Sequence, residues 1–310
     1  MNIVILDRKT LGLDIDMAIF KTFGNVKIYD CTKPNETIER LKEADIVITN
    51  KVVISKEVME NTNLKLICVT ATGMNNIDLE SAKQKNIEVK NVAGYSSASV
   101  VQLAFSMIFK IMQKLDYYKK YVDEGNWQKS DIFTHIDKPF FELDGKKVGI
   151  IGLGDIGKNF AKKASAFDCE VMYFSTSGKN SNSAYKQVSL DELLNNSDVI
   201  TIHCPLNENT KDLLNYENMK NIKDGAILLN LSRGGIINEA DLAKIIDEKE
   251  IYCGIDVASV EPILEDNPLL NVKNKDRLIL TPHIAWASVE ARNRLMKMVA
   301  KNIEEFISQK

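Results

Sequence analysis

The chain has 310 residues, of which 45% are hydrophobic and 27% are charged, and its formal net charge is −3. This length is comfortable for two domains, and the composition is ordinary for a globular protein. The acidic balance argues against nucleic acid or an anionic membrane as a partner, and no apolar run approaches the ~18 residues of a membrane span. Five cysteines without a CxxC pair fit reduced thiols better than disulfides or zinc. We therefore expect a cytoplasmic protein, and the N-terminus resembles a strand, not a signal peptide.

Short β-branched segments alternate with helical patterns along the chain, which is typical of parallel sheets built from βαβ units. A first series of strands is expected at residues 3–6, 26–29, 46–49, 66–69 and 87–89. A long apolar helix is expected over residues 97–120, where it would connect two domains. A second series of strands is expected at residues 148–151, 171–174, 199–202, 226–229, 252–257 and 278–280.

The last expected helix, residues 288–307, carries an apolar stripe at a spacing close to 3.6 residues. The first strand series has few helices to cover it, so we expect this helix to return to the first sheet. The sequence thus predicts an α/β protein with two doubly wound parallel-sheet domains. A Rossmann dinucleotide-binding domain, residues 98–286, would be inserted in a flavodoxin-like substrate domain, residues 1–97 and 287–310.

A glycine-rich loop follows the first strand of the second series. It reads Gly152-Leu153-Gly154-Asp155-Ile156-Gly157, a GxGxxG pattern between a strand and a helix. The three glycines permit a tight turn, a close approach to a pyrophosphate, and close packing of helix on strand. The helix N-terminus offers free N–H groups to the pyrophosphate. A ligand-free tight turn is the structural alternative, and the surrounding βαβ pattern favours a dinucleotide.

The next strand lacks the carboxylate that normally binds the adenosine ribose. The chain continues instead with Ser175, Thr176 and, three residues on, Lys179. Hydroxyls and a lysine make NADP possible, but no arginine is present to grip a 2′-phosphate in a bidentate fashion. We expect NAD by a slight preference, with NADP as the alternative.

Three reactive side chains follow later strands of the second series: Arg233, Glu261 and His283. A guanidinium anchors the carboxylate of a 2-oxo acid and polarises its carbonyl, and an imidazole is suited to proton transfer near neutral pH. A carboxylate beside the imidazole fixes its tautomer and favours its charged form. Each residue taken singly could be structural, but ligands bind at the ends of such strands. The set predicts hydride transfer to a 2-oxo acid, and the histidines lack the spacing of a metal site.

The chain resembles the D-2-hydroxyacid dehydrogenase family over nearly its full length, in the motifs Ser232-Arg233-Gly234-Gly235, Gly254-Ile255-Asp256-Val257 through Glu261-Pro262, and Pro282-His283-Ile284-Ala285-Trp286. The resemblance implies that Arg233 binds substrate, that His283 is the acid/base and that Glu261 is its partner. It implies that a loop of the first domain holds the substrate carboxylate at Thr72, Gly73 and Met74. It also implies cofactor contacts after the strands, at His203, Cys204, Pro205, Leu231, Ser232, Asp256 and His283 itself.

Within the family, the segments 71–78, 91–96 and 285–292 are most similar to the glycerate dehydrogenase (hydroxypyruvate reductase) branch. The resemblance implies reversible reduction of hydroxypyruvate or glyoxylate to D-glycerate or glycolate. The alternatives are pyruvate or a branched 2-oxo acid as substrate, or a dinucleotide-sensing module like the corepressors that share this fold. One departure is Leu103, where the family commonly has histidine. The family also implies a homodimer formed through the 97–120 helix and residues 132–141.

Overall fold

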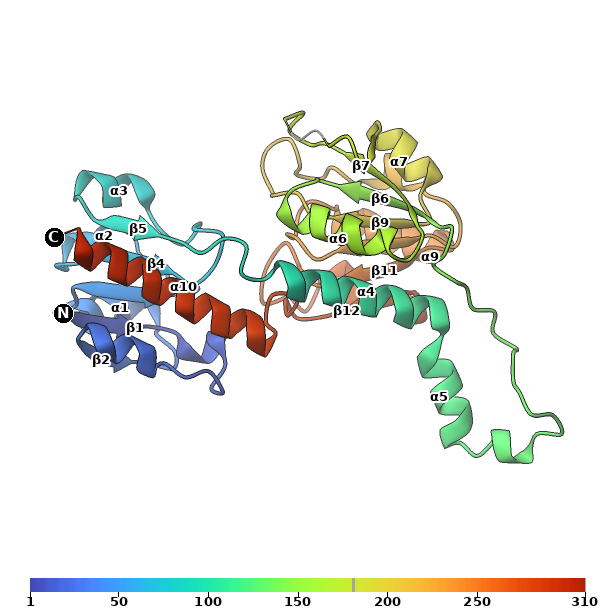
Figure 1. Ribbon diagram of the computed structural model, residues 1–310, viewed down its shortest axis with the longest axis horizontal. Helices are drawn as coiled ribbons and strands as arrows, with labels where there is room; N and C mark the ends of the chain where they lie inside the picture. Colours follow the sequence, from blue (N-terminus) through green and yellow to red (C-terminus); the bar gives the residue numbers. More distant parts are fainter. Residues whose placement is uncertain (180–181, 310) are drawn as a thin grey trace. The chain divides into compact units, whose positions relative to one another are not determined.

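Two parallel sheets organise the chain, and each belongs to a separate unit (Figure 1). The computed structural model describes residues 1–179 and 182–309. Unit 1 comprises Met1–Ser96 and Trp286–Lys310, and unit 2 comprises Ser97–Ala285.

Unit 1 contains a five-stranded sheet, among the described residues, in the order β2-β1-β3-β4-β5. All neighbouring strands are parallel, and this order is the flavodoxin-like one. The strands are β1 (Asn2–Ile5), β2 (Asn25–Ile28), β3 (Ile46–Thr49), β4 (Leu66–Val69) and β5 (Glu88–Lys90). Its helices are α1 (Thr37–Leu41), α2 (Lys56–Glu60), α3 (Leu79–Gln84) and α10 (Val289–Ser308), with 3₁₀ segments η1 (Arg8–Leu11), η2 (Ala18–Phe23) and η3 (Pro34–Glu36).

Helix α10 covers one face of this sheet although it lies at the far end of the sequence (Figure 1). The Ser288 side chain accepts a hydrogen bond from the Ala291 N–H and so caps the helix. The apolar stripe of the helix is buried with the strand residues Ile3 and Ile5. Burial of this stripe removes apolar surface from water and fixes the helix to the sheet.

Unit 2 contains a sheet with the order β12-β11-β10-β9-β6-β7-β8, seven strands within the part of the chain described. The strands are β6 (Lys147–Ile151), β7 (Glu170–Phe174), β8 (Lys186–Gln187), β9 (Val199–Ile202), β10 (Ile227–Asn230), β11 (Tyr252–Ile255) and β12 (Leu278–Leu280). The strand order reverses between β6 and β9, and open α/β sheets bind ligands outside the carboxyl ends of their strands at such a point. The predicted fold class is confirmed.

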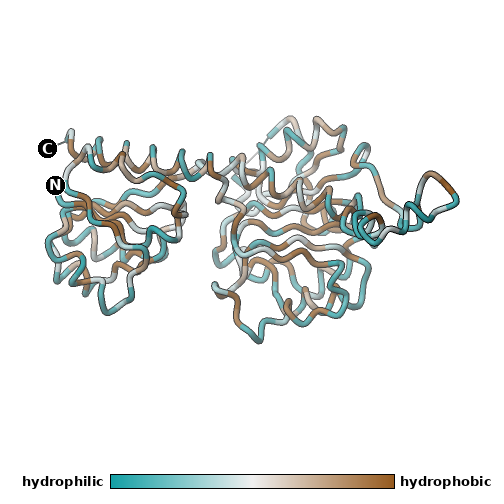
Figure 2. Tube along the Cα trace, turned by 90° about the horizontal axis from the view of Figure 1, so that it is seen from below, coloured by the Kyte–Doolittle hydropathy of each residue, from teal (hydrophilic) through white to brown (hydrophobic). Residues whose placement is uncertain are grey.

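Helices cover both faces of the unit 2 sheet, which explains why its central strands β9 and β10 are buried along their whole length. They are α4 (Ser97–Gln113), α6 (Asp155–Ser165), α7 (Leu190–Asn196), α8 (Tyr216–Met219) and α9 (Glu239–Glu248). Phe105 of α4 stacks on Phe160 of α6 with ring centroids 4.7 Å apart. Figure 2 shows the hydrophobic colour running along the strands, with hydrophilic residues in the turns. Further short segments are η4 (Trp127–Lys129), η5 (Pro268–Asn271) and η6 (Lys275–Arg277).

The structure corrects the expectation of one long helix over residues 97–120. Helix α4 ends at Gln113, Lys114 adopts a left-handed conformation with φ of 51°, and α5 (Leu115–Asp123) starts in a new direction. The Lys114 ammonium lies 3.9 Å from the centroid of the Tyr252 ring. In Figure 1, α5 and the residues after it extend away from the sheet of unit 2 before the chain returns as β6.

Two smaller differences concern the strands. The expected strand 252–257 ends at Ile255, and β8 was not anticipated because it consists of two exposed polar residues.

In the described residues, no single helix is long and apolar enough to cross a membrane. The pair α4 and α5 reaches that length and composition only together, with a bend of 59° between them.

Candidate active site

The candidate residues of unit 2 lie in the loops that follow six neighbouring strands. Gly152 follows β6, Ser175 follows β7, His203 follows β9, and Leu231 to Arg233 follow β10. Asp256 follows β11, and His283 comes three residues after β12. Because these strands are parallel, all six strand ends lie at the same edge of the sheet.

Asp256 organises the end of this edge. Its side chain is buried, with 1% of the residue exposed, and its carboxylate accepts hydrogen bonds from the Thr281 hydroxyl and the Ile284 and Ala285 N–H groups. These bonds are 2.6, 2.9 and 2.8 Å long. Burial raises the pKa of Asp256, while the hydrogen bonds oppose that rise. One carboxylate thus ties β11 to the loop after β12.

His283 stands in this loop with an unusual backbone conformation. Its φ is 53°, in the left-handed region that a histidine rarely adopts. Its N–H donates to the Asp256 carbonyl at 2.8 Å and the Thr281 carbonyl at 3.0 Å, which holds the conformation. Backbone strain of this kind is concentrated at functional sites, where the surroundings impose it.

Glu261 contacts the His283 ring directly. Its Oε2 lies 2.7 Å from Nδ1, and its Oε1 accepts a hydrogen bond from the Ala258 N–H at 3.1 Å. The two side chains are 33% and 26% exposed, so the pair is open to solvent on one side. With Nδ1 directed at the carboxylate, Nε2 is the ring nitrogen that points away from Glu261. The structure therefore brings together two of the three predicted catalytic residues.

Arg233 lies on the adjacent loop. Its guanidinium is exposed and donates one hydrogen bond, 2.7 Å long, to the Ser232 carbonyl. The next residue, Gly234, touches the loop that carries Glu261, because a Cβ there would lie 2.0 Å from the Ala258 carbonyl carbon. Any side chain at Gly234 would force the two loops apart.

Glu239, the first residue of α9, was not anticipated. Its carboxylate accepts hydrogen bonds from the Ser259 N–H (2.5 Å), the Ser259 hydroxyl (2.8 Å) and the Asn267 side chain (2.7 Å). Ser259 and Asn267 flank Glu261 in the sequence, so Glu239 holds both ends of the loop that presents Glu261 to His283. In the sequence Glu239 resembles an ordinary acid in the first turn of a helix.

The glycine loop fits a dinucleotide. Gly152 has φ of 93° and a Cβ there would lie 2.8 Å from the Cys204 nitrogen, while a Cβ at Gly157 would lie 2.3 Å from the Gly152 oxygen. At Gly154 a Cβ would meet no atom within 4 Å, so this backbone borders open space at the start of α6. The neighbouring Ile156 is half-buried, and the Asp155 carboxylate accepts a hydrogen bond from the Ser97 hydroxyl. An open backbone at a helix N-terminus suits a pyrophosphate.

His203 and Cys204 continue this edge after β9. Burial lowers the pKa of His203 to about 3, so its ring is neutral, and its Nε2 lies 3.0 Å from the Thr201 hydroxyl. Its buried Nδ1 has no partner among the described residues. Burial raises the pKa of the Cys204 thiol to about 11, which excludes it as a nucleophile at neutral pH. The Ser232 hydroxyl donates to the Cys204 carbonyl at 2.5 Å, which joins the loop after β10 to the loop after β9. Pro205 and Leu231 are the sequence neighbours of these two residues.

The three expected carboxylate contacts, Thr72, Gly73 and Met74, belong to unit 1. They follow β4 in a loop whose conformation is fixed by side chains. The Thr72 hydroxyl donates to the Val92 carbonyl at 3.0 Å, and the Asn91 amide donates to the Thr72 carbonyl at 2.6 Å. Across the described residues, no group of three or more His, Cys, Asp or Glu side chains could hold a metal ion.

Comparison with known proteins agrees with this geometry. Residues 105–285 match the family model of the NAD-binding domain of the D-isomer specific 2-hydroxyacid dehydrogenases. A hydroxypyruvate reductase of Blautia hydrogenotrophica is 42% identical, covering 99% of this chain and 97% of the relative. This chain belongs to the D-isomer specific 2-hydroxyacid dehydrogenase family.

The family membership extends over both units. A glycerate dehydrogenase of Methylorubrum extorquens is 35% identical over all of this chain and 97% of its own length. Among solved structures, an acyclic imino acid reductase in complex with NADPH and D-Arg superimposes with a TM-score of 0.85 at 29% identity, covering 100% of this chain and 98% of that one. The protein is therefore an NAD(P)-dependent dehydrogenase of this family.

The Glu239 contacts generate a first prediction. A Glu239→Gln enzyme keeps the size of the side chain but directs an NH₂ group at N–H and O–H donors, so the loop carrying Glu261 loosens. We expect kcat for 2-oxo acid reduction to fall about tenfold, a barrier change of about 1.4 kcal/mol, with little change in thermal stability. Glu248→Gln on the same helix is the matched control, because Glu248 bonds the Tyr216 hydroxyl instead. Equal kcat in the two variants would refute a positioning role for Glu239.

Proposed function

We propose that this dehydrogenase reduces hydroxypyruvate to D-glycerate, and glyoxylate to glycolate, reversibly. The Glu261–His283 contact carries the proposal, because it supplies a proton donor beside the loop of Arg233. The names of the relatives, a hydroxypyruvate reductase and a glycerate dehydrogenase, support this substrate over pyruvate or a branched 2-oxo acid. The intact pair favours an enzyme over a dinucleotide-sensing corepressor-like module.

We assign the dinucleotide to unit 2 and the substrate carboxylate to unit 1. The glycine loop would hold the pyrophosphate, and the strand-end residues from Ser175 to Asp256 would line the rest of the cofactor. The reduced nicotinamide supplies the hydride that reaches the carbonyl carbon. The loop of Thr72, Gly73 and Met74 would receive the substrate carboxylate on its backbone N–H groups. The domain containing unit 2 would span residues 98–286, inserted in the substrate domain.

The remaining steps belong to side chains of this chain. Arg233 has guanidinium donors available for the substrate, and a fork of two N–H groups both binds a carboxylate and polarises the adjacent carbonyl. His283 gives the proton on Nε2 to the carbonyl oxygen as the C–H bond forms. Glu261 stabilises the imidazolium before transfer and fixes the tautomer after it. In the reverse direction, the neutral ring takes the hydroxyl proton.

We also place the enzyme in the cytoplasm. Its five cysteines are free, and Cys68, Cys204 and Cys253 are buried. Burial raises the pKa of the Cys68 thiol to about 12 and that of Cys204 to about 11, so both stay protonated. Scattered inert thiols of this kind are typical of proteins from reducing compartments.

We propose a homodimer formed through α5 and the residues that follow it. This segment exposes apolar side chains, with Phe133 88% and Ile136 69% exposed. The Trp127 indole donates to the Phe133 carbonyl and the His135 ring stacks on Tyr121, so the segment is ordered by its own contacts. An ordered, exposed apolar surface is typical of a protein–protein interface.

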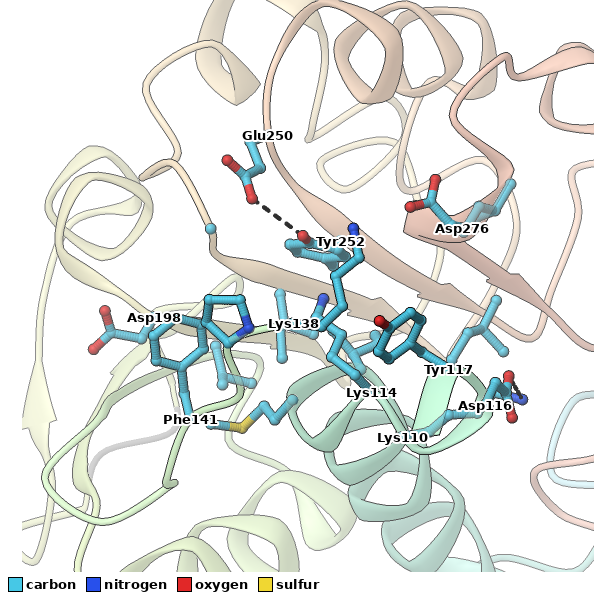
Figure 3. Close-up of a pocket in the computed structure, with 18 of the residues that line it drawn as sticks. Lys110, Lys114, Asp116, Tyr117, Lys138, Phe141, Asp198, Glu250, Tyr252 and Asp276 are labelled. Atoms are coloured by element: carbon cyan, nitrogen blue, oxygen red, sulfur yellow. Dashed lines mark hydrogen bonds and ion pairs between the residues drawn. The ribbon is translucent and has the colours of Figure 1, made fainter. Parts of the chain in front are cut away.

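A cavity of about 980 Å³ adjoins this segment at the amino ends of the unit 2 strands. Figure 3 shows Lys114 beside the Tyr252 ring, and Lys138 and Phe141 of the returning segment also line the cavity. The apolar side chains Ile111, Met112 and Leu278 also line it. The cavity lies at the edge opposite the catalytic residues, so we assign it to subunit contact and not to catalysis.

The catalytic proposal predicts the behaviour of a His283→Ala enzyme. Loss of the general acid should lower turnover of hydroxypyruvate by about 10²–10⁴-fold. The affinity for the dinucleotide, measured by NADH fluorescence, should stay within about twofold, because the glycine loop is unchanged. Turnover near the wild-type value would contradict the assigned proton donor, and joint loss of binding would show a folding defect.

The dimer predicts a second result. Phe133 and Ile136 make few contacts within their own subunit, so a Phe133→Ser, Ile136→Ser double variant should fold normally. Each fully buried apolar side chain contributes about 1.5–3 kcal/mol to association. The Kd of the dimer should therefore be at least about tenfold higher for the double variant than for the wild type. Light scattering over a dilution series measures this, with Leu13→Ser, an exposed leucine of unit 1, as control. A wild-type particle of 34.9 kDa at micromolar concentration would exclude the dimer.

A further inference from the structure

The turn after β7 lies beside the glycine loop. Ile151 of β6 pairs with Phe174 of β7, and the Gly152 N–H donates to the Phe174 carbonyl at 2.9 Å. The adenosine ribose of a dinucleotide reaches this point, and NAD enzymes place an Asp or Glu there for the ribose hydroxyls. In this chain no Asp or Glu occurs from residue 174 to residue 185.

Hydroxyl and ammonium groups stand in place of that carboxylate. Ser175 is buried, and its Oγ has no partner among the described residues. The chain then turns: the Gly178 N–H donates to the Ser175 carbonyl at 3.4 Å, and Gly178 has φ of 66°. The turn leaves Thr176 half-buried and Ser177 exposed. A buried hydroxyl without a partner is costly, and a ligand oxygen would remove that cost.

Lys179 completes the turn with an uncompensated positive charge. Its N–H donates to the Ser177 hydroxyl at 3.2 Å, and its exposed ammonium forms no ion pair within the described parts of the chain. The first acids that follow it in the sequence are Asp191 and Glu192, and Glu192 is already bonded to Lys186 at 2.7 Å. The turn therefore carries net positive charge, with hydroxyl donors next to it.

We propose that this turn binds the 2′-phosphate of NADP(H), and that the enzyme binds NADP at least as tightly as NAD. The inference rests on the proposed dinucleotide reaction and specifies its cofactor. A 2′-phosphate is a dianion with strong acceptor oxygens, which hydroxyls and an ammonium satisfy and a carboxylate would repel. From the sequence alone, the lack of an arginine led us to expect NAD. The structure changes that expectation to NADP, because the Ser175 hydroxyl and the Lys179 ammonium have no partners among the described residues.

Isothermal titration of the purified protein with NADP⁺ and with NAD⁺ tests the proposal without catalysis. The wild type should bind NADP⁺ with an equal or lower Kd than NAD⁺. Lys179→Gln should weaken NADP⁺ about fivefold, in line with one exposed charge-assisted bond, and leave NAD⁺ unchanged. Ser175→Asp should weaken NADP⁺ tenfold or more, because it restores a carboxylate at this position.

Lys186→Gln is the matched control, since it removes the same charge from a neighbouring strand where the lysine is already paired. It should leave both affinities unchanged. Wild-type binding of NADP⁺ tenfold or more weaker than that of NAD⁺ would overturn the proposal, as would equal weakening of both by Lys179→Gln. If neither NADP⁺ nor NAD⁺ bound to the protein, the proposed function itself would be contradicted.

Discussion

The hydrogen bonds of the buried Asp256 carboxylate are the interactions on which the end of the unit 2 sheet that carries His283 depends. This carboxylate accepts three hydrogen bonds from the loop after β12. The backbone carbonyl of Asp256 accepts a fourth hydrogen bond, from the His283 N–H. A buried carboxylate without hydrogen-bond donors would be strongly unfavourable, so Asp256 needs the donors of this loop. The loop in turn needs the carboxylate, because its N–H groups would otherwise lose their acceptor. This mutual requirement holds His283 at a positive φ and aims its ring at Glu261. The position of the His283 ring is thus a property of the sheet edge and not of the histidine alone.

The other strand ends contribute to the same arrangement through close contacts that need particular residues. Gly234 lets the Arg233 loop touch the loop after β11, and Glu239 holds the two ends of that loop. The glycine loop closes against Cys204 in the same way. Arg233, His283 and the glycine loop therefore follow separate strands of one sheet. Such a scaffold keeps reacting groups in place without reorganisation during the reaction.

The amino-acid sequence predicted most of the fold because buried parallel strands are apolar runs that stand out from their surroundings. It did not predict β8, which is two exposed polar residues, or the break at Lys114, where neither proline nor glycine marks the change of direction. At the site, motifs pointed to Glu261 and His283, and the structure places them in contact. The role of Glu239 could not be predicted, because its partners lie 20 and 28 residues away and the sequence shows only an acid in a first helical turn.

The turnover of a Glu261→Gln enzyme tests the central claim, that the Glu261 carboxylate holds the His283 ring in position for proton transfer. Glutamine keeps the size of the side chain and a hydrogen-bond acceptor near Nδ1 but removes the negative charge. We predict that kcat for hydroxypyruvate reduction falls about tenfold or more, while the Kd for NADH, measured by fluorescence, stays within about twofold. A Glu261→Gln enzyme with the kcat of the wild type would contradict the account.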